Sequence, residues 1–184
     1  MKIILNKRCS ALLLAGLFIL QPAHADPYAK GSKIKPFQAK DQHEQAFSFD
    51  AKSTRFLMVS HDMDTGKKAN GVLTTLGKDY LSGKKAVYMA NIHGMPGIGR
   101  TFALPKMRKY AHRIILADDA TLIADFPEQK GKVTILKLAD GKVSSVDYWD
   151  PATGSPDALL KEARARATPL RPCALLLPVP SEPG

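Results

Sequence analysis

Two apolar runs flank a stretch with helical spacing in the middle of the chain. Residues 56–59 and 86–92 are almost continuously apolar, which is typical of buried strands. Between them, apolar side chains recur with the spacing of a helix face at Ala69, Val72, Leu73, Leu76, Tyr80 and Leu81. This pattern predicts a helix over residues 65–84 and therefore two parallel strands joined by a crossover helix. The carboxyl ends of such strands share one edge of the sheet, where ligands usually bind.

The segments on either side predict further elements. Residues 37–49 alternate weakly around a polar turn at 40–44, which predicts two short strands. Residues 98–111 are expected to be helical, with Pro105 either kinking that helix or restarting it. Its apolar positions are expected to face the core: Phe102, Met107 and Tyr110.

The second half of the chain carries the clearest local signals. Residues 114–117 form a third apolar run, and Asp119 can cap a short helix after it. Two β-rich runs within residues 132–148 are separated by Asp-Gly at 140–141, which predicts a hairpin. A Ser-Pro-Asp start predicts a last helix over residues 158–167.

The two ends of the chain depart from this pattern. Residues 1–25 begin with basic side chains, continue with an apolar run and end in small residues, which predicts a cleaved secretory signal. Residues 26–33 are polar and are expected to be a flexible leader. Residues 34–167 are expected to form the one folded domain, and the proline-rich residues 168–184 a disordered tail.

Charge and cysteine usage limit the classes of function. The formal net charge is +10 at pH 7, and the cations are spread along the chain. With a predicted export signal and no nucleic-acid motif, we expect a periplasmic protein whose partner is an envelope protein or an anionic surface, not nucleic acid. No membrane span is expected after signal cleavage. Of the two cysteines, Cys9 leaves with the signal and Cys173 lies in the tail, so no internal disulfide or dithiol pair is expected.

The order of elements resembles the thioredoxin-like superfamily, and in particular its peroxiredoxin branch. Residues 35–42 with 47–49 look like the opening hairpin of that branch. Residues 114–126 are similar to its strand that ends in Asp before a short helix, and residues 133–143 to its late hairpin. The resemblance covers residues 34–167. It implies an α/β, thioredoxin-like fold in which helices flank a central mixed β-sheet that carries an N-terminal β-hairpin.

Two departures from that family bear on function. Its reactive cysteine would fall just after the first central strand, where a helix start lowers a thiol pKa, but residues 61–68 hold no cysteine. The cis-proline that precedes the late hairpin in thioredoxins is also missing, because Lys132 and Val133 stand before Thr134. Peroxidase and disulfide-exchange activity are therefore not expected. The chain looks most like exported thioredoxin-like proteins to which no activity is assigned.

Two His-x-Met pairs follow the central strands and form a candidate metal site. His61 and Met63 come after the first strand, and His93 and Met95 after the second. If both strands end level, imidazole and thioether groups converge on the ligand-binding edge, a donor set that suits copper, with methionine selecting the reduced ion. The alternative is that the methionines fill gaps at the sheet edge and the histidines are ordinary loop residues. Apart from copper, no cofactor is expected.

Acidic pairs at the same strand ends open a further alternative. Asp62 and Asp64 flank Met63, and Asp118 and Asp119 follow the third strand. Carboxylates in pairs can bind a hard cation or transfer protons, although at strand ends they more often cap helices. Three hypotheses result: a redox-inactive binding or accessory protein of the cell envelope, a periplasmic copper-binding protein, and an enzyme with non-thiol chemistry.

Overall fold

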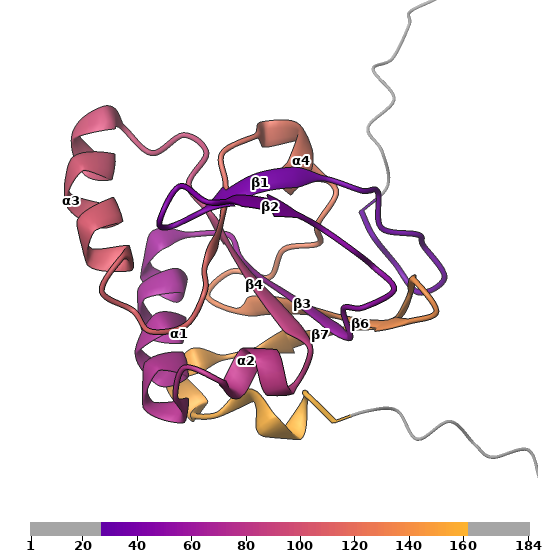
Figure 1. Ribbon diagram of the computed structural model, residues 1–184. Helices are drawn as coiled ribbons and strands as arrows, with labels where there is room; N and C mark the ends of the chain where they lie inside the picture. Colours follow the sequence, from indigo (N-terminus) through magenta and orange to yellow (C-terminus); the bar gives the residue numbers. More distant parts are fainter. Residues whose placement is uncertain (1–26, 162–184) are drawn as a thin grey trace, which may run out of the picture.

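The computed structural model describes residues 27–161, which form one mixed β-sheet with helices packed around it (Figure 1). The predicted signal over residues 1–25 and the predicted tail over residues 168–184, with Cys173, lie outside the described residues. No helix within residues 27–161 is both long and apolar enough to cross a membrane.

The strands and helices alternate in the central part of the chain and end in a hairpin. The strands are β1 (Gln38–Asp41), β2 (Ala46–Ser48), β3 (Phe56–Ser60), β4 (Ala86–Asn91), β5 (Ile115–Ala117), β6 (Val133–Ala139) and β7 (Lys142–Trp149). The helices are α1 (Met63–Leu76), α2 (Tyr80–Gly83), α3 (Gly97–Met107) and α4 (Ala120–Ala124), followed by the 3-10 turns η1 (Pro151–Thr153) and η2 (Pro156–Ala158).

The sheet has the strand order β2-β1-β5-β4-β3-β6-β7. β3, β4 and β5 are parallel neighbours, and β6 runs antiparallel to β3 on its other side. Every residue of β3 is buried, because helices or loops cover both faces of the sheet there. The α/β class, the mixed central sheet and the N-terminal hairpin are confirmed.

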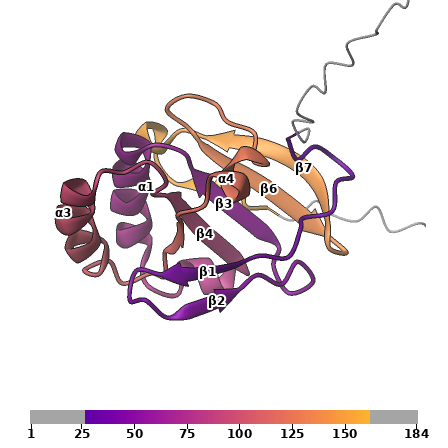
Figure 2. The ribbon, with the colours of Figure 1, turned by 90° about the horizontal axis from the view of Figure 1, so that it is seen from above.

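Alternation along the strands divides the core into two layers. Leu57, Val59 and Met89 point to one face, which is covered by α4 and the segment before β1. Met58 and Tyr88 point to the other face, which is covered by α1, α2 and the turns after β7. α3 lies beside α1 and outermost in the molecule (Figure 2). None of its residues is buried.

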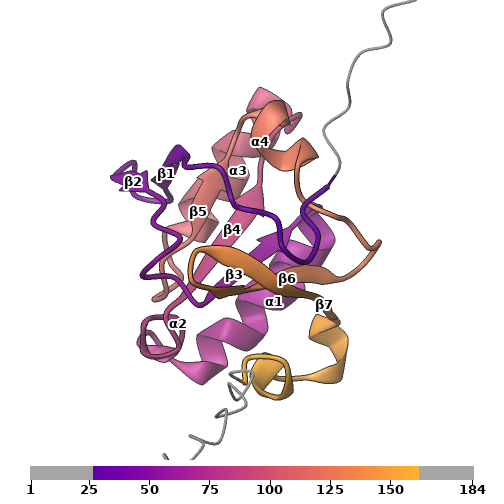
Figure 3. The ribbon, with the colours of Figure 1, turned by 90° about the vertical axis from the view of Figure 1, so that its right-hand side faces the viewer.

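The segment before β1 is part of the fold, which corrects the prediction of a flexible leader. Figure 3 shows it crossing the sheet toward β1. The Tyr28 side chain is only 8% exposed and packs edge-on against Phe126 at a ring distance of 5.1 Å. Gly31 N donates to Val143 O at 2.8 Å, and Val143 N donates to Ser32 O at 2.9 Å. The mostly polar sequence concealed this because one aromatic anchor and backbone pairing hold the segment.

The predicted helix over residues 65–84 is two helices. α1 begins at Met63 because Asp62 caps it. It ends at Gly77, whose φ of 95° lies in the region that favours glycine, and α2 follows after a short turn. Tyr80 and Leu81 therefore belong to α2 and not to the face of α1.

Two further helix predictions need correction. α3 ends at Met107 with Pro105 inside it, and its Phe102 is 66% exposed, so the expectation that Phe102 faces the core was wrong. Met107 and Tyr110 are half-buried against the core, as expected. The helix predicted over residues 158–167 starts as the 3-10 turn η2, and residues 159–161 are not helical. Its remaining residues lie outside the described part of the chain.

Candidate functional site

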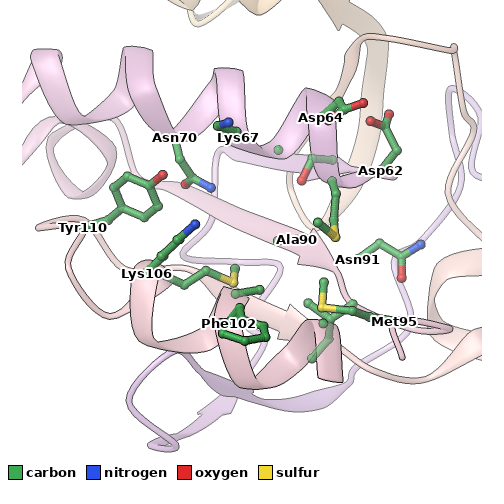
Figure 4. Close-up of a pocket in the computed structure, with 17 residues that line it drawn as sticks. Asp62, Asp64, Lys67, Asn70, Ala90, Asn91, Met95, Phe102, Lys106 and Tyr110 are labelled. Carbon is green, nitrogen blue, oxygen red and sulfur yellow. The ribbon is translucent and has the colours of Figure 1, made fainter. Parts of the chain in front are cut away.

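A cavity of about 370 Å³ lies between the start of α1 and α3, above the carboxyl ends of β3 and β4. We call it the α1–α3 cavity. Figure 4 shows its lining side chains, which come from both helices and from the ends of the two strands. It lies at the sheet edge that the sequence predicted for ligand binding, and α3 supplies the wall that the sequence did not predict.

The carboxylate of Asp62 caps the start of α1. Thr65 donates from its backbone N to Asp62 Oδ1 at 2.8 Å and from its hydroxyl to Oδ2 at 2.7 Å. Partial burial opposes ionisation of Asp62, but these hydrogen bonds outweigh it and lower its pKa. An ionised carboxylate thus occupies the positive end of α1, the place at which a helix start would otherwise stabilise a thiolate.

Close packing brings α1 to the sheet at this point. The Ser60 hydroxyl at the end of β3 accepts a hydrogen bond from Tyr88 at 3.0 Å. A Cβ atom at Gly66 would lie 3.3 Å from that Ser60 oxygen, which is tighter than nearly all real contacts. Glycine at this position therefore lets the first turn of α1 rest on β3, and Ser60 becomes part of the cavity floor.

Hydrogen-bond donors gather at the far end of the cavity from Asp62. Asn70 is 4% exposed, and its Oδ1 accepts from His112 Nε2 at 2.9 Å. Its amide nitrogen points into the cavity, near the Lys106 ammonium and the Tyr110 hydroxyl (Figure 4). Among the described residues, this Asn70 nitrogen has no hydrogen-bond partner. Three donors thus face the same space: Asn70 from α1, Lys106 from α3 and Tyr110 from the segment after α3.

His112 holds Asn70 in that orientation. The ring is 1% exposed and stacks on Tyr110 at a centroid distance of 5.6 Å. Burial lowers its pKa to about 4, so the ring is neutral at pH 7. An amide oxygen can only accept, so Nε2 carries the ring hydrogen. Nδ1 is then buried without a partner among residues 27–161.

The wall between the two ends is apolar and partly open. Met63 from α1, with Met95 and Phe102 from the α3 side, lines it. Met63 is 60% exposed and Phe102 is 66% exposed, although both are large apolar side chains. Thioether side chains adapt to ligands of differing shape. This wall can therefore cover an apolar group without a fixed outline.

The structure does not bring the two predicted metal-binding histidines together. His61 Nε2 lies 3.3 Å from the Thr134 hydroxyl on β6, and that hydroxyl donates to Pro127 O. His93 Nδ1 lies 3.2 Å from Asp118 O, just after β5. Because β6 and β5 flank the β3–β4 pair on opposite sides, the two rings turn away from each other.

The two methionines of that prediction do share a space. Met63 and Met95 both line the α1–α3 cavity, and neither histidine lines it. Within residues 27–161, no group of three or more His, Cys, Asp or Glu side chains is placed to hold a metal ion. Copper binding stays a prediction, which rests on the thioether pair more than on the imidazoles.

The acidic pairs separate as well. Asp62 and Asp64 line the cavity, whereas Asp118 forms a bidentate ion pair with Arg100 of α3. Asp119 caps α4 through Thr121 N at 2.8 Å. An enzyme centred on all four carboxylates stays a prediction, and the geometry does not assemble them at one point.

Sequence reasoning missed Asn70 and Lys106. The one available signal was a polar Asn70 on the apolar face of a predicted helix.

No family model matches the chain, and no curated protein matches its sequence. Among solved structures, a protein described as thiol:disulfide interchange protein DsbE from Chlorobium tepidum aligns with a TM-score of 0.52 and 12% identity, covering 72% of this chain and 95% of that one. The thioredoxin domain of a thiol-disulfide oxidoreductase from Bacteroides vulgatus aligns at 0.50 and 11%, covering 72% and 99%. Peroxidoxin BcpB from Mycobacterium tuberculosis aligns at 0.49 and 15%, covering 72% and 94%.

Identities this low concern the fold alone. The fold is thioredoxin-like, as the order of elements predicted.

Proposed function

We propose that this protein is an exported, redox-inactive binding or accessory protein that holds its ligand in the α1–α3 cavity. The observation that carries the proposal is the start of α1. There the Asp62 carboxylate, and not a thiol, takes the backbone and side-chain hydrogen bonds of Thr65 beside an open cavity.

The chemistry of the cavity supports binding. Its volume of about 370 Å³ is within the range of small-molecule sites, about 300–1,000 Å³. Apolar side chains with a few convergent polar groups are the usual lining of such sites. Thiol exchange would need a sulfur nucleophile, and both cysteines of the chain lie outside residues 27–161.

A neutral fluorescent dye tests whether the cavity binds. Nile red titrations would compare the wild type with Ala103→Trp, which places an indole in the cavity from α3. Thr101→Trp, on the exposed side of the same helix, is the matched control. We expect dye binding in the wild type and the control and its loss in Ala103→Trp. Equal binding by all three proteins, or by none, would refute the proposal. An insulin-reduction assay is expected to show no activity.

Copper is the second candidate, because Met63 and Met95 line one cavity. A copper(I) titration would compare the wild type with His61→Ala/His93→Ala and with Met63→Leu/Met95→Leu. Submicromolar binding that is lost in the methionine variant would support a thioether site. Loss of binding in the histidine variant alone would show that the imidazoles, and not the thioethers, bind copper. Equal binding by all three proteins would refute a copper site at this edge of the sheet.

We propose further that the protein works in the periplasm beside an envelope protein or an anionic surface. The signal-like residues 1–25 support this location, and the positive net charge supports this partner: it is +10 for the whole chain and +7 once the signal leaves with its three cations and no acid. Co-sedimentation with anionic vesicles, but not with zwitterionic ones, and release by salt are expected if the partner is a lipid surface. Cross-linking in intact cells would identify a protein partner.

A further inference from the structure

The α1–α3 cavity has two chemically different ends. Figure 4 shows Asn70, Lys106 and Tyr110 together at one end, Asp62 and Asp64 at the other, and Met95 and Phe102 along the wall between them. A ligand that crosses the cavity therefore meets donors and positive charge first, then thioether and aromatic groups, then carboxylates.

The buried amide of Asn70 is the fixed part of the donor end. His112 Nε2 donates to its oxygen and so fixes the orientation of the amide, whose nitrogen, a donor only, points into the cavity. No acceptor within residues 27–161 takes a hydrogen bond from this nitrogen, so an incoming oxygen can accept from it without breaking a contact in the described part of the chain. The Tyr110 hydroxyl beside it has no hydrogen-bond partner within residues 27–161 either.

The cations that line this end are free of ion pairs within the described part of the chain. Lys67 lies one turn before Asn70 on α1, and Lys106 projects from α3. The neighbouring arginines are instead engaged: Arg100 with Asp118, Arg108 with Glu44 and Arg113 with Asp41. The two unpaired ammonium groups and the two neutral donors together form a site for an anionic oxygen pair.

The rest of the cavity restricts the chemistry of the ligand beyond its anionic group. Met63, Met95 and Phe102 offer an adaptable apolar surface, so the body of the ligand is apolar. Asp62 and Asp64 at the opposite end repel a second negative charge. We infer that the ligand is a monocarboxylate with an apolar body, of the kind represented by a medium-chain fatty acid, bound through its carboxylate at Lys67, Asn70, Lys106 and Tyr110. This inference rests on the proposed function of the cavity.

Displacement of Nile red by ligands of one chain length tests the inference. Decanoate, decanol and decanedioate would be compared below the concentrations at which they aggregate. We expect decanoate to displace the dye at a concentration at least about tenfold lower than decanol, since charge-assisted hydrogen bonds contribute roughly that factor. Decanedioate is expected to bind more weakly than decanoate.

Variants at the lysines separate charge recognition from apolar binding. Lys67→Met/Lys106→Met is expected to abolish the preference for decanoate over decanol while Nile red still binds. Lys68→Met/Lys109→Met removes the same charge from exposed positions that do not line the cavity, and is expected to keep the preference. Tyr110→Phe should weaken decanoate and leave decanol unchanged.

The outcomes for the two proposals differ. Equal displacement by decanoate and decanol, or a preference that survives in Lys67→Met/Lys106→Met, would overturn the carboxylate assignment while dye binding upholds the cavity. Failure of Nile red to bind the wild-type protein would overturn both. Thermal unfolding of each lysine variant, expected to match the wild type because the lysines are exposed, confirms that a lost preference is not a folding defect.

Discussion

Nε2 of His112 donates to Oδ1 of Asn70 across 2.9 Å, between two side chains that are both less than 5% exposed. This buried pair connects the core under α1 to the donor end of the α1–α3 cavity. Its neutral state depends on the low pKa of the His112 ring, about 4, which burial causes. Protonation of the ring would place an unpaired charge in the core beside the cavity.

Stability is therefore expected to fall as the pH drops from about 6.5 toward 4. In that window the histidine of the unfolded chain, with a pKa near 6.5, binds a proton, whereas the buried ring of the folded protein does not. Proton binding therefore stabilises the unfolded state relative to the folded one. The contribution of His112 to the free energy of unfolding is fully present above pH 6.5. It amounts to about 3 kcal/mol at most, because the pKa falls from 6.5 to about 4 on folding and each pKa unit corresponds to about 1.4 kcal/mol. Urea unfolding at intervals from pH 7.5 to 4 measures it.

His112→Leu should flatten part of that pH dependence and lower stability at pH 7, because Asn70 loses its buried partner. Burial also lowers the pKa of His61, so His61→Gln is expected to remove a separate share of the same slope. His43→Gln, at an exposed turn position, is the control. An unchanged slope in His112→Leu would contradict the assignment.

Loss of the α1 cap is expected to destabilise the fold. Asp62→Ala removes the acceptor for both Thr65 donors and should cost about 1 kcal/mol in urea unfolding at pH 7. Asp62→Asn keeps a side-chain oxygen and should cost less. Because the pKa of Asp62 is lowered, its contribution is present above about pH 4 and is lost as the pH falls below it. Asp64→Asn, which removes no cap, should leave stability nearly unchanged.

Tyr28 is expected to anchor the segment before β1. Tyr28→Ala removes a buried ring packed against Phe126 and should cost about 3 kcal/mol, as other buried aromatic truncations do. Tyr28→Phe keeps the ring and loses the acceptor for Lys35 N, so about 1 kcal/mol is expected. Hydrogen exchange should show protection of the Gly31 and Val143 amides in the wild type. Fast exchange of both amides would contradict this anchoring and support the prediction of a flexible leader.

Two glycines of the central segment are expected to respond oppositely to alanine. Gly71 lies inside α1 with open space around it, so Gly71→Ala should stabilise by about 0.5–1 kcal/mol. Gly77 ends α1 at a φ of 95°, so Gly77→Ala should destabilise by about 1–3 kcal/mol. Thermal unfolding of both variants checks the signs. Destabilisation by Gly71→Ala would mean that the helix is not regular there.

Local patterns determined much of the fold. Strands β3 and β4, the crossover helix between them and the hairpin from β6 to β7 were predicted from apolar periodicity and an Asp-Gly turn. Asp140 and Gly141 both have the positive φ values, 51° and 74°, that such a turn requires. The Asp119 cap of α4 was predicted for the same reason: these signals depend on residues within one turn or strand. The order of elements then led to the thioredoxin-like class.

The site depended on relations that no local pattern contains. His61 and His93 follow neighbouring strands, yet their rings turn apart because His61 contacts β6 and His93 contacts Asp118 just after β5. Phe102 was expected in the core and is exposed because α3 lies at the outer side of α1. Helical periodicity shows which side chains share a face, whereas only the packing of α3 beside α1 decides what that face meets. The sequence by itself thus determined the elements and their order, and the tertiary structure alone decided which side chains line the α1–α3 cavity.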